Sequence, residues 1–234
     1  MLLLFDVDGT LISTGGVGVR AMGAAGRELF GPDFSEARTE YAGRLDPLII
    51  DDLLKGNDQE ISPANRSAMR AAYRRHLESA LSVPGNRRSL PGVTELLNAL
   101  ATTSEVAMGL LTGNFEDTGT LKLRACGIEP ARFGVRVWGD ESPEDPPRRE
   151  HLPAVALSRY RQFFQREMPP SRAVVIGDTP HDVACARANG CRSLAVATGS
   201  FSIERLREAG ADHAVQDLSS TGEVIKTLAR LTMN

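Results

Sequence analysis

The sequence lacks the features that membrane and secreted proteins require. Its 234 residues contain no apolar run that approaches the roughly 20 residues of a membrane-spanning helix. The apolar residues 2–5 follow no basic leader and end at Asp6, which is not the pattern of a signal peptide. We therefore expect a soluble, unprocessed protein.

Cysteine and excess charge are also scarce. The three cysteines are an odd set without the paired spacing of a zinc site, and we expect them to pack as small apolar residues. That usage is typical of a reducing compartment, so we expect a cytoplasmic protein. The formal net charge of −3 provides no field that would attract nucleic acid. We expect neither a nucleic-acid nor a membrane partner, and nothing in the sequence indicates an oligomeric state.

What the sequence does contain is an alternation of buried strands and helices. Hydrophobic residues make up 41% of the chain, enough for a full core. Short apolar runs that end in small or acidic residues are typical of parallel strands buried on both faces. The predicted strands cover residues 2–7, 106–111, 135–138, 173–176, 193–197 and 213–215, and the predicted helices cover residues 93–100, 115–125, 153–166 and 182–189. This pattern predicts an α/β fold with a doubly wound, mainly parallel sheet.

One region interrupts the alternation. Residues 16–88 have helical stretches and polar turns but no buried strand. Segments rich in Gly and Pro, Thr14-Gly15-Gly16 and Pro84-Gly85-Asn86, border this region and have the composition of hinges. We therefore predict a core of residues 1–15 and 89–234, with residues 16–88 as a helical cap over one edge of the sheet.

Polar residues follow three of the predicted strands, at the strand ends where ligands of open parallel sheets bind. Each of these residue types also occurs in ordinary turns and helix caps. Four carboxylates from neighbouring strands, however, repel one another unless a cation lies between them, and Mg²⁺ binds such hard oxygen ligands. The residues are Asp6 and Asp8 at the end of the first strand, Thr112, Gly113 and Asn114 after the second, and Asp178 and Asp182 after the fourth.

Through these residues the chain resembles the haloacid dehalogenase superfamily of phosphatases and phosphomutases. Asp6-Val7-Asp8-Gly9-Thr10-Leu11 resembles the first family motif, Thr112 the second, and Gly177-Asp178 through Asp182 the fourth. The resemblance covers nearly the whole chain and implies a small inserted cap after the first motif. Chlorinated-acid dehalogenases of this superfamily do not need an acid two residues beyond the nucleophile, so Asp8 argues for a phosphatase.

The resemblance implies roles for the residues that would meet the substrate. Asp6 would be the nucleophile that becomes an aspartyl phosphate, and Asp8 would protonate the leaving oxygen and then activate water. Thr112 and the backbone amide of Gly113 would bind the phosphoryl oxygens, with Asn114 as a further substrate-binding residue.

The resemblance also implies the ligands of Mg²⁺. Asp6, the backbone carbonyl of Asp8, and Asp178 would bind the ion, and Asp182 would lie beside it or bind through a water. The cation would offset the negative charge on the phosphoryl oxygens.

The third family motif, a Lys that balances the charge of nucleophile and phosphate, departs from the usual pattern. Lys122 is the only Lys between the second and fourth motifs, and it comes early, on the predicted helix after the second. We assign it the role, with Arg148 and Arg149 as alternatives. Ten helical residues at about 1.5 Å each would place its Cα roughly 15 Å along the axis, so the helix must start late or the loop fold back. We then expect the ammonium within ion-pair distance of the Asp6 or Asp178 carboxylate.

The cap contributes one candidate. Gly43-Arg44-Leu45-Asp46 resembles a cap substrate loop of the phosphoglycolate phosphatase-like branch. Arg44 could bind a substrate carboxylate or second phosphate, or it could pair with Asp46 at the start of a helix.

Three functions follow from this reading. A Mg²⁺-dependent phosphatase of a small phosphorylated metabolite is the leading hypothesis, because a two-acid first motif and a capped cleft suit that chemistry. A phosphomutase would use the same core residues. A catalytically idle phosphate-sensing or partner protein on the same fold is the third, and the presence of all the acids disfavours it.

Overall fold

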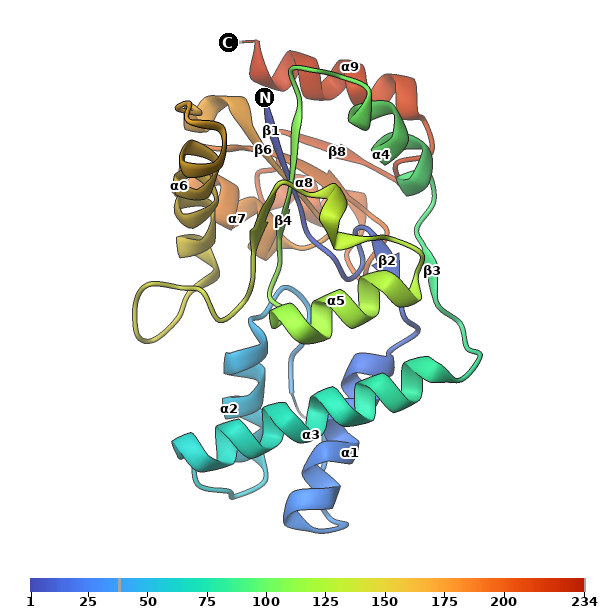
Figure 1. Ribbon diagram of the computed structural model, residues 1–234, viewed down its shortest axis with the longest axis vertical. Helices are drawn as coiled ribbons and strands as arrows, with labels where there is room; N and C mark the ends of the chain where they lie inside the picture. Colours follow the sequence, from blue (N-terminus) through green and yellow to red (C-terminus); the bar gives the residue numbers. More distant parts are fainter. Residues whose placement is uncertain (38, 234) are drawn as a thin grey trace.

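The computed structural model describes residues 1–37 and 39–233 and contains the predicted parallel sheet. Six strands form it in the order β5-β4-β1-β6-β7-β8 (Figure 1). Their bounds are β1 Leu2–Phe5, β4 Ala107–Leu111, β5 Val135–Val137, β6 Ala173–Gly177, β7 Arg192–Val196 and β8 His213–Val215. Each strand lies within two residues of a predicted one and pairs in parallel with its neighbours, so the predicted α/β class is confirmed.

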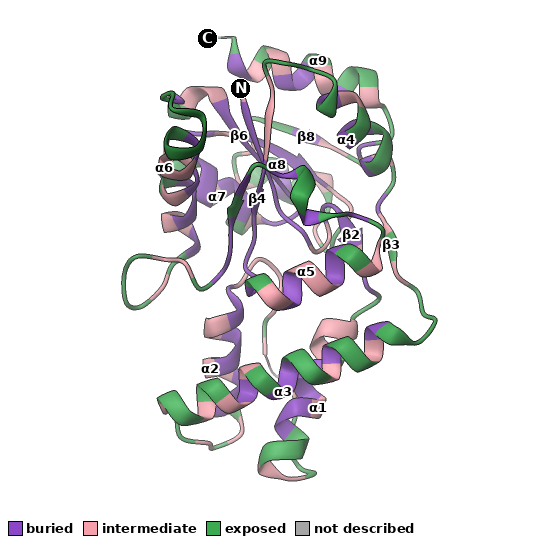
Figure 2. Cartoon of the chain, in the orientation of Figure 1, coloured by how far each residue is buried: buried purple, intermediate pink, exposed green. Residues whose placement is uncertain are grey.

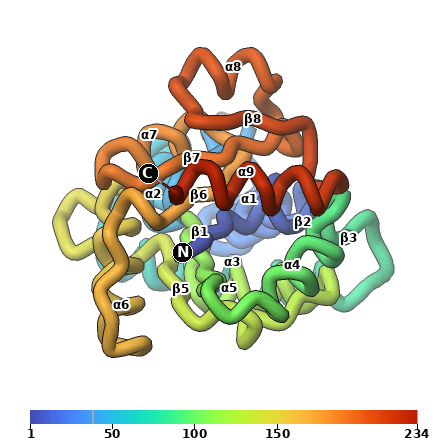
Figure 3. The backbone as a smooth tube through the Cα atoms, turned by 90° about the horizontal axis from the view of Figure 1, so that it is seen from above, coloured from blue at the N-terminus to red at the C-terminus, as the bar shows by residue number. Residues whose placement is uncertain are grey.

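Helices cover both faces of this sheet, which is why its strands read as continuous apolar runs. In β1, Leu3 and Phe5 pack into one apolar cluster while Leu2 and Leu4 pack into another, because successive side chains point to opposite faces. The two central strands β1 and β6 are buried along their whole length (Figure 2), and Figure 3 shows α6 and α7 on one side of the sheet and α4 and α9 on the other. The helices are α4 Val93–Ala101, α5 Glu116–Ala125, α6 Leu152–Phe164, α7 Pro180–Ala188, α8 Ile203–Glu208 and α9 Thr221–Thr232, with short 3-10 helices at Pro130–Arg132, Arg149–His151 and Pro170–Arg172.

The order of the strands places β1 where the winding of the sheet reverses. The chain adds β4 and β5 on one side of β1 and then returns to pair β6 with the other side. Phe5 of β1 is in register with Leu110 and Ile176, so the carboxyl ends of the three strands are level. Ligands of doubly wound sheets bind at this point.

Three helices lie beyond this carboxyl edge: α1 Val17–Phe30, α2 Asp46–Gly56 and α3 Pro63–Ser82 (Figure 1). They surround an apolar cluster of their own, which includes Met22, Leu53 and Tyr73. Phe115, at the start of α5, belongs to the same cluster, so the helical layer packs against the segment that follows β4. The division into a core and a cap at residues 16–88 stays a prediction.

The two chain segments that lead into and out of this layer are joined by a feature that the sequence did not predict. The strands β2 Ile12–Ser13 and β3 Arg88–Ser89 form an antiparallel pair. Two-residue strands are too short for a hydrophobic period to reveal them. Gly15 and Gly16 follow β2 with φ of 62° and 78°, backbone angles that favour glycine.

Across residues 1–37 and 39–233, every helix is too short or too polar to cross a lipid bilayer.

Candidate active site

The carboxyl ends of β1, β4 and β6 open into a cavity of about 310 Å³, which residues of α1, α2 and α3 close from the other side. Most of the predicted site residues therefore meet in one place, although they come from distant parts of the chain. Those that line the cavity are Asp6, Asp8, Arg44, Thr112, Gly113, Asn114, Lys122 and Asp178.

Three buried carboxylates gather at the sheet end of the cavity. One oxygen from each of Asp6, Asp178 and Asp182 lies within 4.8 Å of the other two. Burial raises the pKa of Asp6 to about 7 and that of Asp178 to about 8. The neighbouring acids add to both rises, because each negative charge disfavours the next. A cation bound beside these carboxylates would lower their pKa values and favour the ionised forms.

The arrangement around Asp178 suits Mg²⁺. Thr10 Oγ1 donates to Asp178 Oδ1 at 3.1 Å and fixes that carboxylate. A side chain at Gly9 or Gly199 would collide with Asp178 Oδ2, so glycine at both positions allows the backbone to approach this carboxylate closely. The grouped carboxylates of Asp6, Asp178 and Asp182 supply hard oxygen atoms of the kind that Mg²⁺ prefers. The residues present therefore fit a bound magnesium ion.

Asp182 has a different place in the cluster. The backbone N–H and the hydroxyl of Thr179 donate to Asp182 Oδ2 at 3.1 and 2.7 Å, which closes a capping box at the start of α7. The other oxygen, Oδ1, accepts a hydrogen bond from Arg149. Since both oxygens already accept from the protein, Asp182 suits a position beside a metal ion rather than that of a direct ligand.

Arg149, named only as an alternative by the sequence, is the cation at Asp6. Its Nη2 donates to Asp6 Oδ1 at 2.9 Å and also to Asp182, and its side chain is only 6% exposed. Arg148 is exposed, and its Nε lies 3.8 Å from Glu150 Oε2. A Pro-rich loop has no helical or strand periodicity that would predict which of two adjacent arginines faces the site. Only the folded structure shows that it is Arg149.

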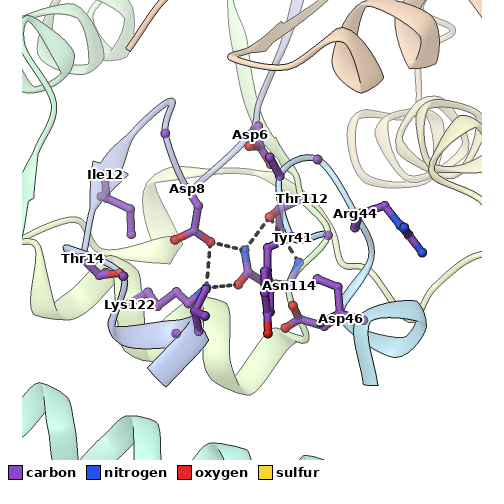
Figure 4. Close-up of a pocket in the computed structure, with 18 of the residues that line it drawn as sticks. Asp6, Asp8, Ile12, Thr14, Tyr41, Arg44, Asp46, Thr112, Asn114 and Lys122 are labelled. Carbon is purple, nitrogen blue, oxygen red and sulfur yellow. Dashed lines mark hydrogen bonds and ion pairs between the residues drawn. The ribbon is translucent and has the colours of Figure 1, made fainter. Parts of the chain in front are cut away.

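Asp8 is held by an amide and an ammonium (Figure 4). Asn114 Nδ2 donates to Asp8 Oδ2 at 2.9 Å, and Lys122 Nζ donates to the same oxygen at 2.8 Å. Asn114 Oδ1 accepts from Lys122 at 2.6 Å, and Asn114 Nδ2 also donates to Thr112 Oγ1 at 2.8 Å. Asn114 thus connects three of the predicted site residues, and its amide atoms are engaged with protein partners rather than free for substrate.

Lys122 reaches the cavity, but its partner differs from the expected one. We expected an ion pair with Asp6 or Asp178, and the ammonium pairs with Asp8. The helix α5 begins at Glu116, so Lys122 lies about 9 Å along the axis, not 15 Å. Helical side chains also lean toward the helix N-terminus, which carries the ammonium back to the strand ends.

Arg44 points away from the Asp8 and Lys122 side chains (Figure 4). Its Nη2 donates to Asp52 Oδ2 at 2.6 Å, and its Nη1 lies 3.9 Å from Glu40 Oε2. The alternative pair with Asp46 is therefore wrong for this structure. A role for Arg44 in substrate binding would require it to leave Asp52, and that role stays a prediction.

Asp46 instead joins the cap loop to the segment after β4. Its backbone N–H donates to the Gly113 carbonyl at 2.7 Å. Its Oδ2 accepts from the Phe115 N–H at 3.2 Å and from Thr118 Oγ1 at 3.4 Å. Burial raises the pKa of Asp46 to about 6, although the nearby Lys122 opposes the rise. A side chain at Gly113 would collide with the Arg44 carbonyl, so glycine permits the close approach of the two segments.

Asp46 and Tyr73 are among the polar residues of the cavity that were missed as site candidates. Asp46 was considered only as a partner for Arg44, because Asp before Pro47 is an ordinary helix start. Tyr73 lies in the middle of α3, fully buried, and lines the cavity. A single Tyr on the apolar face of a helix belongs to no recognisable sequence motif. The only sequence feature that could have indicated a site residue is its hydroxyl among apolar neighbours.

Known proteins resemble this chain in sequence. A family model described as HAD-hydrolase-like matches residues 150–221. The pyrophosphatase PpaX of Listeria monocytogenes is 25% identical over 228 residues, which cover 96% of this chain and 95% of that protein. A phosphoglycolate phosphatase of Chromobacterium violaceum is 27% identical and covers 95% of both chains.

Solved structures share the fold. CbbY of Rhodobacter sphaeroides in complex with phosphate has a TM-score of 0.73 and 24% identity, covering 94% of this chain and 96% of that one. A second structure of CbbY, with xylulose-(1,5)bisphosphate, has a TM-score of 0.71. The arrangement of sheet and helical layer is thus one already seen in a protein crystallised with phosphorylated ligands.

Proposed function

We propose that the chain is a haloacid dehalogenase-like hydrolase, and specifically a Mg²⁺-dependent phosphatase of a small phosphorylated metabolite. The observation that carries the proposal is the contrast between two acids in one cavity. Asp6 is buried within an acid cluster, whereas the side chain of Asp8 is 43% exposed and is held by Lys122. Such a difference in environment suits a nucleophile and a proton-transfer group.

The reaction proceeds in two displacements. A carboxylate oxygen of Asp6 attacks the phosphorus atom, and the bond to the leaving alcohol breaks as Asp8 gives its proton to that oxygen. Asp8 then takes a proton from water, whose oxygen attacks the phosphorus of the aspartyl phosphate. Inorganic phosphate leaves and Asp6 is regenerated.

Asp6, Asp178 and the backbone carbonyl of Asp8 would hold Mg²⁺, with Asp182 beside it, and the bound ion would offset negative charge on the phosphoryl oxygens. Thr112 and the Gly113 amide, at the end of β4, are proposed to donate to those oxygens.

We assign the charge of the third motif to Arg149. Its guanidinium contacts both Asp6 and Asp182, which is the place where a fixed cation would balance the nucleophile. Lys122 receives a different task, since it contacts Asp8 and Asn114: it orients the carboxylate that transfers protons. A cytoplasmic location stays a prediction from the sequence.

The test is release of inorganic phosphate by the purified chain from a panel of phosphorylated metabolites, with Mg²⁺ or with a chelator. We expect release with Mg²⁺, none with the chelator, and none from Asp6→Asn. The exposed Asp33→Asn serves as a matched control that keeps activity. Release that survives chelation contradicts the proposal. Isomerised phosphate esters without free phosphate indicate a phosphomutase, and phosphate binding without turnover indicates a sensor.

A further inference from the structure

The hydroxyl of Tyr73 is buried and has no hydrogen-bond partner among residues 1–37 and 39–233. Burial raises the pKa of this phenol, so the group is a neutral hydroxyl. The Thr118 hydroxyl lies near enough to lower that pKa, but it makes no contact with hydrogen-bond geometry to Tyr73, and its single proton is directed at Asp46 or at the Phe115 carbonyl. A buried polar atom without a partner is costly, and in a wall of a cavity it indicates a missing ligand.

A second donor points to the same place. An ammonium has three N–H donors, and Lys122 uses two, to Asp8 and to Asn114. Gly18 of α1 lines the cavity, and a Cβ there would lie 3.2 Å from Lys122 Nζ and 3.5 Å from the Tyr73 hydroxyl. The two polar atoms therefore lie on the same side of the cavity, next to Gly18.

An acceptor completes the set. Asp46 lines the cavity, and its Oδ2 accepts from Phe115 and Thr118, whereas no described residue donates to Oδ1. The charged groups that act on the Tyr73 hydroxyl are Lys122, Asp46 and Asp8. Arg44 also lines the cavity, but its guanidinium is paired with Asp52 and points away from Asp8 and Lys122. Two acids against one ammonium repel a second anionic group on the substrate.

We propose that Tyr73, Asp46 and Lys122 form a subsite for a hydroxyl of the leaving group. A hydroxyl accepts from Tyr73 or Lys122 and donates to Asp46, while a carboxylate has no proton to donate and meets the charge of Asp46. The substrate class is therefore a phosphate monoester of a polyhydroxylated alcohol, such as a polyol or sugar, with no second anionic group. This inference rests on the phosphatase activity proposed above.

The test compares kcat/KM for glycerol phosphate and propyl phosphate, which differ only in their hydroxyls. The parent should prefer glycerol phosphate by about 10-fold, and Tyr73→Phe should lower that ratio about 3- to 10-fold, as expected for one lost hydrogen bond. Tyr160→Phe is the matched control, because it removes the same atom from a tyrosine of α6 outside the cavity and should leave the ratio unchanged.

The repulsion of a second anionic group on the substrate can be measured separately. Phosphoglycolate should be a poorer substrate than glycerol phosphate, and Asp46→Asn should narrow the difference. Turnover of both alkyl esters with an equal ratio in parent and Tyr73→Phe overturns the subsite and leaves the phosphatase standing. Failure of the parent to release phosphate from any ester with Mg²⁺ present overturns the proposed activity, and the subsite with it.

Discussion

At the sheet end of the cavity the acids are buried and share one guanidinium, whereas at the cap end Asp8 is partly exposed and is held by one ammonium. Asp6 has a side chain 7% exposed and a pKa raised by burial, while 43% of the Asp8 side chain meets solvent. Two carboxyl groups separated by a single residue thus work under different conditions. Environment, rather than residue type, distinguishes the proposed nucleophile from the proposed acid and base.

The largest expected effect tests this division directly. Asp6→Asn should lower kcat by at least about 10³-fold with every ester, because no other group replaces the nucleophile. Asp8→Asn should cost about 10²- to 10⁴-fold with alkyl phosphates and less with p-nitrophenyl phosphate, whose leaving group needs no proton. Steady-state phosphate release measures both. If the two variants lost equal activity whatever the leaving group, the division of roles would be wrong.

The two cations should differ in their effect on stability. Arg149→Met leaves Asp6 and Asp182 buried without their partner and should lower the free energy of unfolding by about 3–5 kcal/mol. Lys122→Met leaves the more exposed Asp8, which water can solvate, and should cost about 1–3 kcal/mol. Urea unfolding monitored by circular dichroism measures both values. The exposed Arg148→Met is the control, with an expected change within about 0.5 kcal/mol.

The acid cluster should make stability depend on pH when no metal is added. Burial raises the pKa values of Asp6 and Asp178 from the usual 3.8 to about 7 and about 8, so the folded state binds protons that the unfolded state has released. Stability from these protons is fully present below pH 4 and is lost as the pH rises toward 8. Between pH 5 and 8, Tm should therefore fall, and added Mg²⁺ should reverse the fall.

Asp178→Ala provides the control for that experiment. The substitution removes a proposed metal ligand and one of the two acids with a raised pKa. The fall of Tm between pH 5 and 8 and the rise of Tm on addition of Mg²⁺ should therefore both become smaller. A variant that responds to Mg²⁺ as the parent does would show that the ion binds elsewhere.

The smallest expected effect lies at the cap end. Tyr73→Phe removes a buried hydroxyl that lacks a partner, so the free energy of unfolding should rise by about 1 kcal/mol. Tm in the absence of substrate measures it. A clear loss of stability would mean that the hydroxyl has a partner in the folded chain.

The strands and the acids at their ends could be predicted because both are local features. A strand buried on both faces is a continuous apolar run, and the polar residue that ends it stands next to it in the sequence. Asp6, Thr112 and Asp178 were therefore identified together with the strands that carry them. The magnesium prediction followed from the charge and the hard oxygen atoms of the four carboxylates, together with the family resemblance.

The partners of these acids were decided by tertiary structure. Lys122 meets Asp8 across 114 residues of sequence, and Arg149 meets Asp6 across 143. Which long side chain reaches which carboxylate depends on where α5 begins and how the loop before α6 turns, and no periodicity encodes either. Tyr73 faces the cavity only because α3 packs on α1 over the open edge of the sheet. The sequence by itself determined the sheet and its row of acids, because the apolar pattern of a buried strand depends only on residues that are neighbours in the chain. The pairing of charges and the proposed hydroxyl subsite depend instead on how the helices pack across the carboxyl edge of the sheet.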